Sequence, residues 1–97
     1  MKSLEEYRKQ IDEIDRKLIA LFEERMQVSG GIAAYKRAHA LPILDQKREE
    51  QKLAALSGLA SPAMAPYVAE LWRKIFELSR SYQEETGKDA ASGEGKE

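Results

Sequence analysis

The apolar residues in the first third of the chain follow a seven-residue repeat. The repeat forms two rows offset by three positions, Leu4, Ile11, Leu18 and Ile32 in one and Tyr7, Ile14, Leu21, Val28 and Tyr35 in the other. Two such rows form one stripe on an α-helix. Ser3 is a suitable N-cap for this helix, with Glu6 in the capping-box position. The pattern therefore predicts a helix from about residue 4 to about residue 38.

The predicted first helix is too long to be covered by its own chain. At 1.5 Å per residue it would extend for about 50 Å, which exceeds the diameter of a domain of 97 residues. A second copy of the chain is the natural cover for the rest of the stripe, so we predict a homodimer. Gly30-Gly31 lies inside the helix. Because each glycine costs about 1 kcal/mol relative to alanine, we expect a weak point or bend there.

Two further helices follow the first. Pro42 disfavours helix in the residue before it, so the first helix should end near residue 40. Asp45 is placed to cap a second helix that stops at Ser57-Gly58. A third helix begins between residues 61 and 66. Its apolar face consists of Val68, Leu71, Trp72, Ile75, Leu78 and Tyr82.

These elements predict an all-α fold, in which a three-helix protomer with a long first helix forms an intertwined homodimer. The domain covers residues 1–85. Residues 86–97 are mostly polar, and we expect them to form a disordered tail.

Composition narrows the possible functions. The chain has no cysteine and one histidine, which excludes disulfides and thiolate metal sites and argues against a histidine-rich metal site. The net charge of -1 argues against a nucleic-acid partner. There is no apolar run long enough for a membrane span and no signal-peptide core, so we expect no membrane partner and a cytoplasmic location.

Arg25 occupies a position of the first row where an apolar residue is expected. A charge in such a seam is costly unless it is paired or bound to something. Lys36 lies eleven residues later, three helical turns on and on nearly the same face. Two aligned cations suggest an anionic ligand, although both could instead be solvated side chains at the edge of a dimer seam. Arg8 points about 100° away from this face, so it could reach only a pocket of a partner chain or the solvent.

Other polar residues also stand out. Asp45, Arg48 and Glu49 lie in a charged cluster that opens the second helix, although a charged helix start is common. Ser79 and Gln83 adjoin the apolar face of the third helix at a spacing of four residues. Buried hydroxyl and amide groups need hydrogen-bonding partners, which could be the backbone, another helix or a ligand.

Taken together, these residues resemble the all-helical (AroQ-type) chorismate mutases, in their monofunctional bacterial form. The resemblance covers residues 4–84. It rests on RKQIDEIDRKLIALFEER, on Lys36 followed by DQKRE at 45–49, and on SRSYQ at 79–83. It implies a homodimer with two identical sites that bind chorismate and convert it to prephenate in aromatic amino acid biosynthesis. It specifies no second enzyme of the shikimate pathway as a partner.

The resemblance also implies a role for each candidate residue. Arg8 matches the arginine that enters the other protomer's pocket, and Arg25 and Arg48 match the arginines that bind carboxylates. Lys36 and Gln83 match the groups that hold the ether oxygen, the lysine also contacting a carboxylate. Asp45 and Glu49 match the residues that position the ring hydroxyl. Ser79 matches a serine that lies near a carboxylate.

The implied reaction is a unimolecular Claisen rearrangement, which needs no cofactor, nucleophile or metal. Two alternatives stay open. An isochorismate-pyruvate lyase of the same fold would also bind a cyclic dianion, although Glu49 fits the mutases better. A non-catalytic helical dimerisation module would explain the heptads, but it would explain neither Arg25 nor the Ser79–Gln83 pair.

Overall fold

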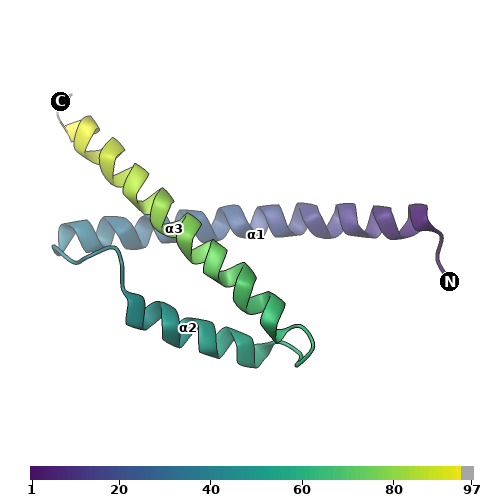
Figure 1. Cartoon of the computed structure of the whole chain (residues 1–97). Coiled ribbons are helices and arrows are strands. Elements are labelled where there is room, and N and C mark those ends of the chain that lie inside the picture. The colour runs from purple at the N-terminus through teal and green to yellow at the C-terminus, as the bar shows by residue number, and fades with distance from the viewer. Residues whose placement is uncertain (95–97) are drawn as a thin grey trace.

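The computed structural model describes the backbone of residues 1–94 and the side chains of residues 1–87. It contains three helices, α1 (Leu4–Ala38), α2 (Gln46–Leu59) and α3 (Ala65–Glu94), and no strand within the described residues (Figure 1). The predicted all-α class and the long first helix are thereby confirmed. None of the helices in this part of the chain has the length and apolar character that a membrane span requires.

Helix α1 begins at its predicted cap, because the Ser3 hydroxyl accepts a hydrogen bond of 3.1 Å from the Glu6 amide. The helix then continues without a break through Gly30-Gly31. A Cβ atom added to Gly30 would lie 3.4 Å from Cε2 of Tyr82. This is an ordinary van der Waals distance, so the Tyr82 ring of α3 lies beside α1 at position 30 without requiring a glycine there.

The C-terminal end of α1 turns the chain into the next loop. The Leu41 amide donates to the Lys36 carbonyl at 2.8 Å, and the Ala40 amide donates to the Arg37 carbonyl at 3.3 Å. This pair of bonds defines a Schellman motif. Its left-handed position is occupied by Ala40, with φ of 53°, where glycine is more usual. The motif reverses the chain and carries residues 41–45 back alongside the end of α1.

Helices α2 and α3 differ from their predicted ranges at their C-terminal ends. Helix α2 continues to Leu59, one residue past Gly58. Helix α3 continues to Glu94, whereas the sequence pattern predicts that the helical domain ends at residue 85. Gly87 and Gly93 each weaken a helix by only about 1 kcal/mol, and the alanine, lysine and glutamate residues of this segment favour helix. Residues 95–97 of the expected tail lie outside the described residues.

Helix α3 packs against both α1 and α2, whereas α1 and α2 do not pack directly on each other. The N-terminal half of α1 extends well beyond the other two helices (Figure 1). The Cα radius of gyration is 17.5 Å, compared with about 13 Å for a compact chain of 100 residues. The single chain is therefore open, with a space between α1 and α2 that α3 spans.

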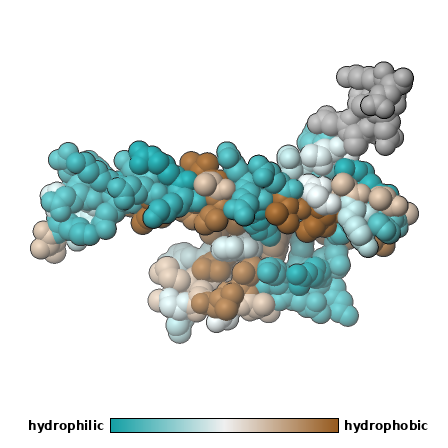
Figure 2. Space-filling model, turned by 180° about the vertical axis from the view of Figure 1, so that it is seen from behind, coloured by the Kyte–Doolittle hydropathy of each residue, from teal (hydrophilic) through white to brown (hydrophobic). Residues whose placement is uncertain are grey.

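This open arrangement leaves little buried core in one chain. Among the residues whose side chains are described, the buried apolar ones are Ala33 and Phe76. Both predicted rows of α1 stay exposed, with 56% of Leu18 and 61% of Leu21 accessible to solvent. Figure 2 shows apolar residues gathered along α1 and on the helices below it. An apolar face of this extent is far larger than the isolated apolar residues normal on a monomer surface.

Candidate active site

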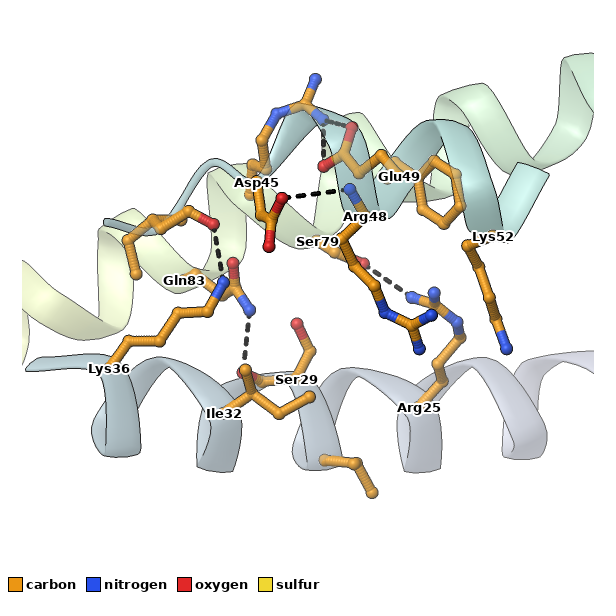
Figure 3. A pocket seen from close by; sticks show the side chains of 14 residues that line it. Arg25, Ser29, Ile32, Lys36, Asp45, Arg48, Glu49, Lys52, Ser79 and Gln83 are labelled. Atoms are coloured by element: carbon orange, nitrogen blue, oxygen red, sulfur yellow. Dashed lines mark hydrogen bonds and ion pairs between the residues drawn. The ribbon is translucent and has the colours of Figure 1, made fainter. Parts of the chain in front are cut away.

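A cavity of about 540 Å³ lies where the C-terminal half of α1, the start of α2 and the middle of α3 come together (Figure 3). This volume is within the range usual for small-molecule sites. Its lining residues are Arg25, Val28, Ser29, Ile32, Lys36, Ile43, Asp45, Arg48, Glu49, Lys52, Phe76, Ser79, Arg80 and Gln83. All three helices and the loop after α1 thus contribute to one cavity.

Seven of the eight candidate residues from the sequence line this cavity, and they are Arg25, Lys36, Asp45, Arg48, Glu49, Ser79 and Gln83. The eighth, Arg8, does not. It is exposed on the N-terminal part of α1 that extends beyond the other helices. Arg8 lies seventeen residues before Arg25 on the same helix, which is about 25 Å along its axis.

Arg25 is held by two contacts with α3. Its Nη1 donates a hydrogen bond of 2.8 Å to the hydroxyl of Ser79, and its guanidinium carbon lies 5.8 Å from the centroid of the Phe76 ring. Partial burial lowers the pKa of the Arg25 guanidinium from its ordinary value, because desolvation disfavours the charged form. Ion pairs among residues 1–87 do not include Arg25, so an anion entering the cavity would offset that desolvation.

Lys36 is positioned by the loop that follows its own helix. Its Nζ donates a hydrogen bond of 3.0 Å to the backbone carbonyl of Ile43. The Schellman motif at the end of α1 brings this carbonyl back over the last turn of the helix. An ammonium group has three donors, so two remain for a ligand, and Figure 3 shows the amine beside Gln83 at one end of the cavity.

Gln83 and Ser79 supply buried hydrogen-bonding groups from α3. Gln83 is 7% exposed, and its Nε2 donates to the backbone carbonyl of Ser29 at 3.1 Å. This bond fixes which way the carboxamide faces and leaves a second N–H donor. Ser79 is 8% exposed; besides accepting from Arg25, its hydroxyl lies 3.7 Å from Sδ of Met26. The sequence did not determine which groups Ser79 and Gln83 bond to, and in the structure these partners lie on α1.

Helix α2 presents its first turns to the cavity. Asp45 is the N-cap, as predicted, and its Oδ1 accepts from the Arg48 amide at 3.0 Å. The Arg48 guanidinium points toward Arg25 (Figure 3) and has no hydrogen-bonding partner among the residues whose side chains are described. Glu49 forms an ion pair with Arg80 of α3. Two guanidinium groups, one from α1 and one from α2, thus converge on the same space.

Sequence reasoning missed three polar residues of the cavity, which are Ser29, Lys52 and Arg80. Lys52 lies four residues after Arg48, so helical spacing could have placed it on the same face. Arg80 lies three residues before Gln83, but nothing in the side-chain pattern distinguishes it from an ordinary arginine at the edge of an apolar face. The backbone carbonyl of Ser29 carries no signal in the side-chain pattern.

The cavity is strongly cationic although the chain is not. Its lining includes five cationic side chains, which are Arg25, Lys36, Arg48, Lys52 and Arg80, and two anionic ones, which are Asp45 and Glu49. The whole chain has a net charge of -1, so positive charge is concentrated here. Within the described residues no cluster of histidine, cysteine, aspartate and glutamate could hold a metal ion.

The fold and the site define an all-α protein whose central pocket suits a compact organic anion. Comparison with known proteins gives the family: the family "Chorismate mutase type II" matches residues 7–84. The chain therefore belongs to the type II chorismate mutase family.

Individual relatives agree with this assignment. The chorismate mutase of Methanocaldococcus jannaschii is 40% identical over 50 residues, which span 52% of this chain and 50% of that protein. T-protein of Haemophilus influenzae is 29% identical over 89 residues, which span 90% of this chain and 24% of that protein. The chain thus spans half or less of these two relatives.

The fold is also similar to a solved structure. The chorismate mutase (form II) of Thermus thermophilus superposes with a TM-score of 0.81 and 28% sequence identity, over 86% of this chain and 96% of that chain. The arrangement of three helices described above is therefore one that a chorismate mutase of known structure also adopts.

Proposed function

We propose that this protein catalyses the rearrangement of chorismate to prephenate. The observation that carries the proposal is the convergence of Arg25, Lys36 and Gln83, from two helices, on one cationic cavity of about 540 Å³. Chorismate is a compact cyclic dianion, so both its size and its charge suit this cavity. Membership of the type II chorismate mutase family supports the same reaction.

The reaction is a Claisen rearrangement within one molecule. The ether C–O bond breaks while a C–C bond forms between the enolpyruvyl side chain and the ring, and no proton or electron is exchanged with the protein. The protein contributes by selecting the folded conformer of a flexible substrate, which is an orientation effect. It also stabilises the negative charge that develops on the ether oxygen, for which fixed donors in a desolvated site are effective.

The candidate residues that act on charge have two roles. Arg25 and Arg48 bind the substrate carboxylates, since planar guanidinium groups match carboxylates well. Lys36 and Gln83 face the ether oxygen. Both are anchored by backbone carbonyls, those of Ile43 and Ser29, so their remaining donors are held in place before the substrate arrives.

The other residues complete the substrate contacts. Asp45 and Glu49 position the ring hydroxyl, directly or through the backbone. Ser79, which accepts a hydrogen bond from Arg25, lies beside a carboxylate. These side chains sit at the α2 and α3 walls of the cavity.

We further propose that two protomers form an intertwined homodimer in which Arg8 of each chain enters the pocket of the other. The exposed apolar rows of α1 support this, because a second α1 would cover them. The N-terminal half of α1 extends beyond its own α2 and α3 (Figure 1), so Arg8 is free to reach another chain. The completed site would then contain a further cation for the dianion.

The proposal is tested by adding the purified protein to chorismate without any cofactor and following the loss of chorismate and the appearance of prephenate. Isochorismate is incubated in parallel, with release of pyruvate as the readout of the lyase alternative. Rearrangement of chorismate at a rate far above the uncatalysed one is the expected result. Turnover of isochorismate alone, or of neither compound, would contradict the proposal.

Replacing Arg25 separates an enzyme from a structural dimerisation module. In Arg25→Leu, a partly buried charge without an ion pair is exchanged for an apolar side chain, so we expect the melting temperature to stay the same or rise. Turnover should fall by at least about 100-fold, because a carboxylate loses its guanidinium partner. Circular dichroism and the chorismate assay measure the two effects. A stable dimer with unchanged turnover would argue against a catalytic role for Arg25.

Replacing Gln83 by glutamate should make the activity depend on pH, with higher activity at acid pH. Burial raises the pKa of a carboxyl group at this position. Below that pKa the protonated acid can donate a hydrogen bond to the ether oxygen, whereas above it a carboxylate would repel both this oxygen and the Ser29 carbonyl. The kcat of Gln83→Glu should therefore rise as the pH falls, while the wild type should show no such rise. An unchanged neutral optimum in the variant would count against the assignment of Gln83.

A further inference from the structure

Glu49 and Arg80 form the ion pair that joins α2 to α3 beside the cavity. Nη1 of Arg80 donates to both carboxylate oxygens of Glu49, to Oε2 at 2.6 Å and to Oε1. The Glu49 side chain is 27% exposed and the Arg80 side chain is 31% exposed. The other two ion pairs among residues 1–87 connect neighbouring residues of α3 and are more than half exposed. The Glu49–Arg80 pair is thus the partly buried one that crosses between helices.

The position of the pair makes it part of the cavity wall. Both residues line the main cavity, and both also line a smaller neighbouring cavity of about 240 Å³ between α2 and α3. Arg80 follows Ser79 directly and lies almost one helical turn before Gln83. The segment of α3 that presents the hydroxyl and the carboxamide to the ligand therefore also fixes Glu49.

Charge provides the physical reason for such a pair. A free carboxylate in a pocket for a dianion would repel the ligand, whereas a carboxylate already paired with a guanidinium repels it much less. An ionised carboxylate has about four lone-pair sites, so hydrogen bonds from Arg80 leave acceptors for another donor. Glu49 can therefore accept a hydrogen bond from a hydroxyl of the ligand while its charge is compensated.

We propose that Arg80 is a positioning residue, which holds the carboxylate of Glu49 in the orientation that accepts the ring hydroxyl of the substrate. This inference rests on the proposed function and on the role of Glu49 within it. Arg80 acts on the substrate through Glu49, so its effect should depend on the hydroxyl group.

The test compares five proteins, namely the wild type, Arg80→Gln, Arg80→Lys, Glu49→Gln and the double variant. For each, kcat and KM are measured with chorismate and with an analogue in which hydrogen replaces the ring hydroxyl. Lys74→Gln is the matched control, because Lys74 is an exposed cation of α3 whose ion pair with Glu77 lies outside both cavities. Circular dichroism melting reports any loss of folding.

With chorismate, Arg80→Gln should lower kcat/KM by about 10- to 100-fold, the effect of removing one partner of a partly buried charged hydrogen bond. Arg80→Lys should recover part of the loss. The double variant should be no worse than the poorer single variant, because both changes remove the same contact. With the analogue that lacks the hydroxyl, Arg80→Gln should lose several-fold less activity than with chorismate, because only the repulsion between the unpaired Glu49 carboxylate and the dianion remains.

Three results would overturn the inference alone. Equal losses with chorismate and with the analogue would mean that Arg80 acts through its own charge on the dianion, and multiplicative losses in the double variant would mean that Arg80 and Glu49 act independently. If Arg80→Gln lost activity only in proportion to a lower melting temperature, the role would be structural. A wild-type protein that does not convert chorismate would overturn the proposed function and this inference together.

Discussion

Lys36→Ala is expected to lower kcat by at least about 100- to 1000-fold, the usual effect of removing one donor to charge that develops in a transition state. The ammonium group of Lys36 is held by the Ile43 carbonyl and, in the proposed mechanism, faces the ether oxygen whose negative charge grows as the C–O bond breaks. The arginines bind carboxylates whose charge changes little during the reaction. Loss of Lys36 should therefore affect kcat more strongly than KM.

The measurement is steady-state kinetics of purified Lys36→Ala, with Lys74→Ala as the control for loss of an exposed lysine on α3. Circular dichroism should give nearly the same melting temperature for both. Lys36→Arg is an informative third variant, because a planar guanidinium keeps the charge but cannot adopt the position of the ammonium group. A kcat of Lys36→Ala close to that of the wild type would contradict the role assigned to the lysine.

Two inactive variants, Arg8→Ala and Lys36→Ala, are expected to restore activity when they form mixed dimers. In the proposed dimer each site takes Lys36 from one chain and Arg8 from the other. A mixed dimer therefore has one site with neither residue and one intact site. Random pairing of equal amounts gives half mixed dimers, so the mixture should reach about one quarter of the wild-type activity.

The chains are mixed by co-expression, or by unfolding and refolding together, and the chorismate assay follows recovery. Mixing Arg8→Ala with Arg8→Gln is the matched control, because no pairing of these two chains restores an arginine at position 8. Activity that stays at the level of the single variants would contradict a site shared between chains. Full activity of Arg8→Ala by itself would mean that Arg8 has no part in the site.

The sequence predicts the helices well where the side-chain pattern repeats. The rows that contain Leu4 and Tyr7 define α1 from its cap to its last turn, because a helix of 35 residues is long enough for the repeat to recur several times. Its end near Pro42 and the cap at Asp45 follow from local backbone chemistry. The C-terminal end of α3 was missed, because a polar composition without an apolar face is compatible with either helix or disorder.

The candidate site was predicted where a residue breaks a pattern. Arg25 interrupts an apolar row, and Lys36 repeats its direction three turns later. Arg80 breaks no pattern, since an arginine near the edge of an apolar face is ordinary, and its role depends on how α2 lies against α3. The sequence could not predict the roles of the Ile43 and Ser29 carbonyls, because every residue has a backbone carbonyl. Only the folded path of the chain determines which carbonyls accept from Lys36 and Gln83.

The hydrogen bond from Lys36 to a backbone carbonyl determines which sequence changes the loop between α1 and α2 can accept. A carbonyl at position 43 is supplied by any amino acid, so exchange of Ile43 for another residue of similar bulk should leave the lysine in place. The route of the loop matters more than its composition. Lengthening or shortening the 41–44 segment by one residue would move that oxygen, and such indels should therefore be tolerated far less readily than substitutions.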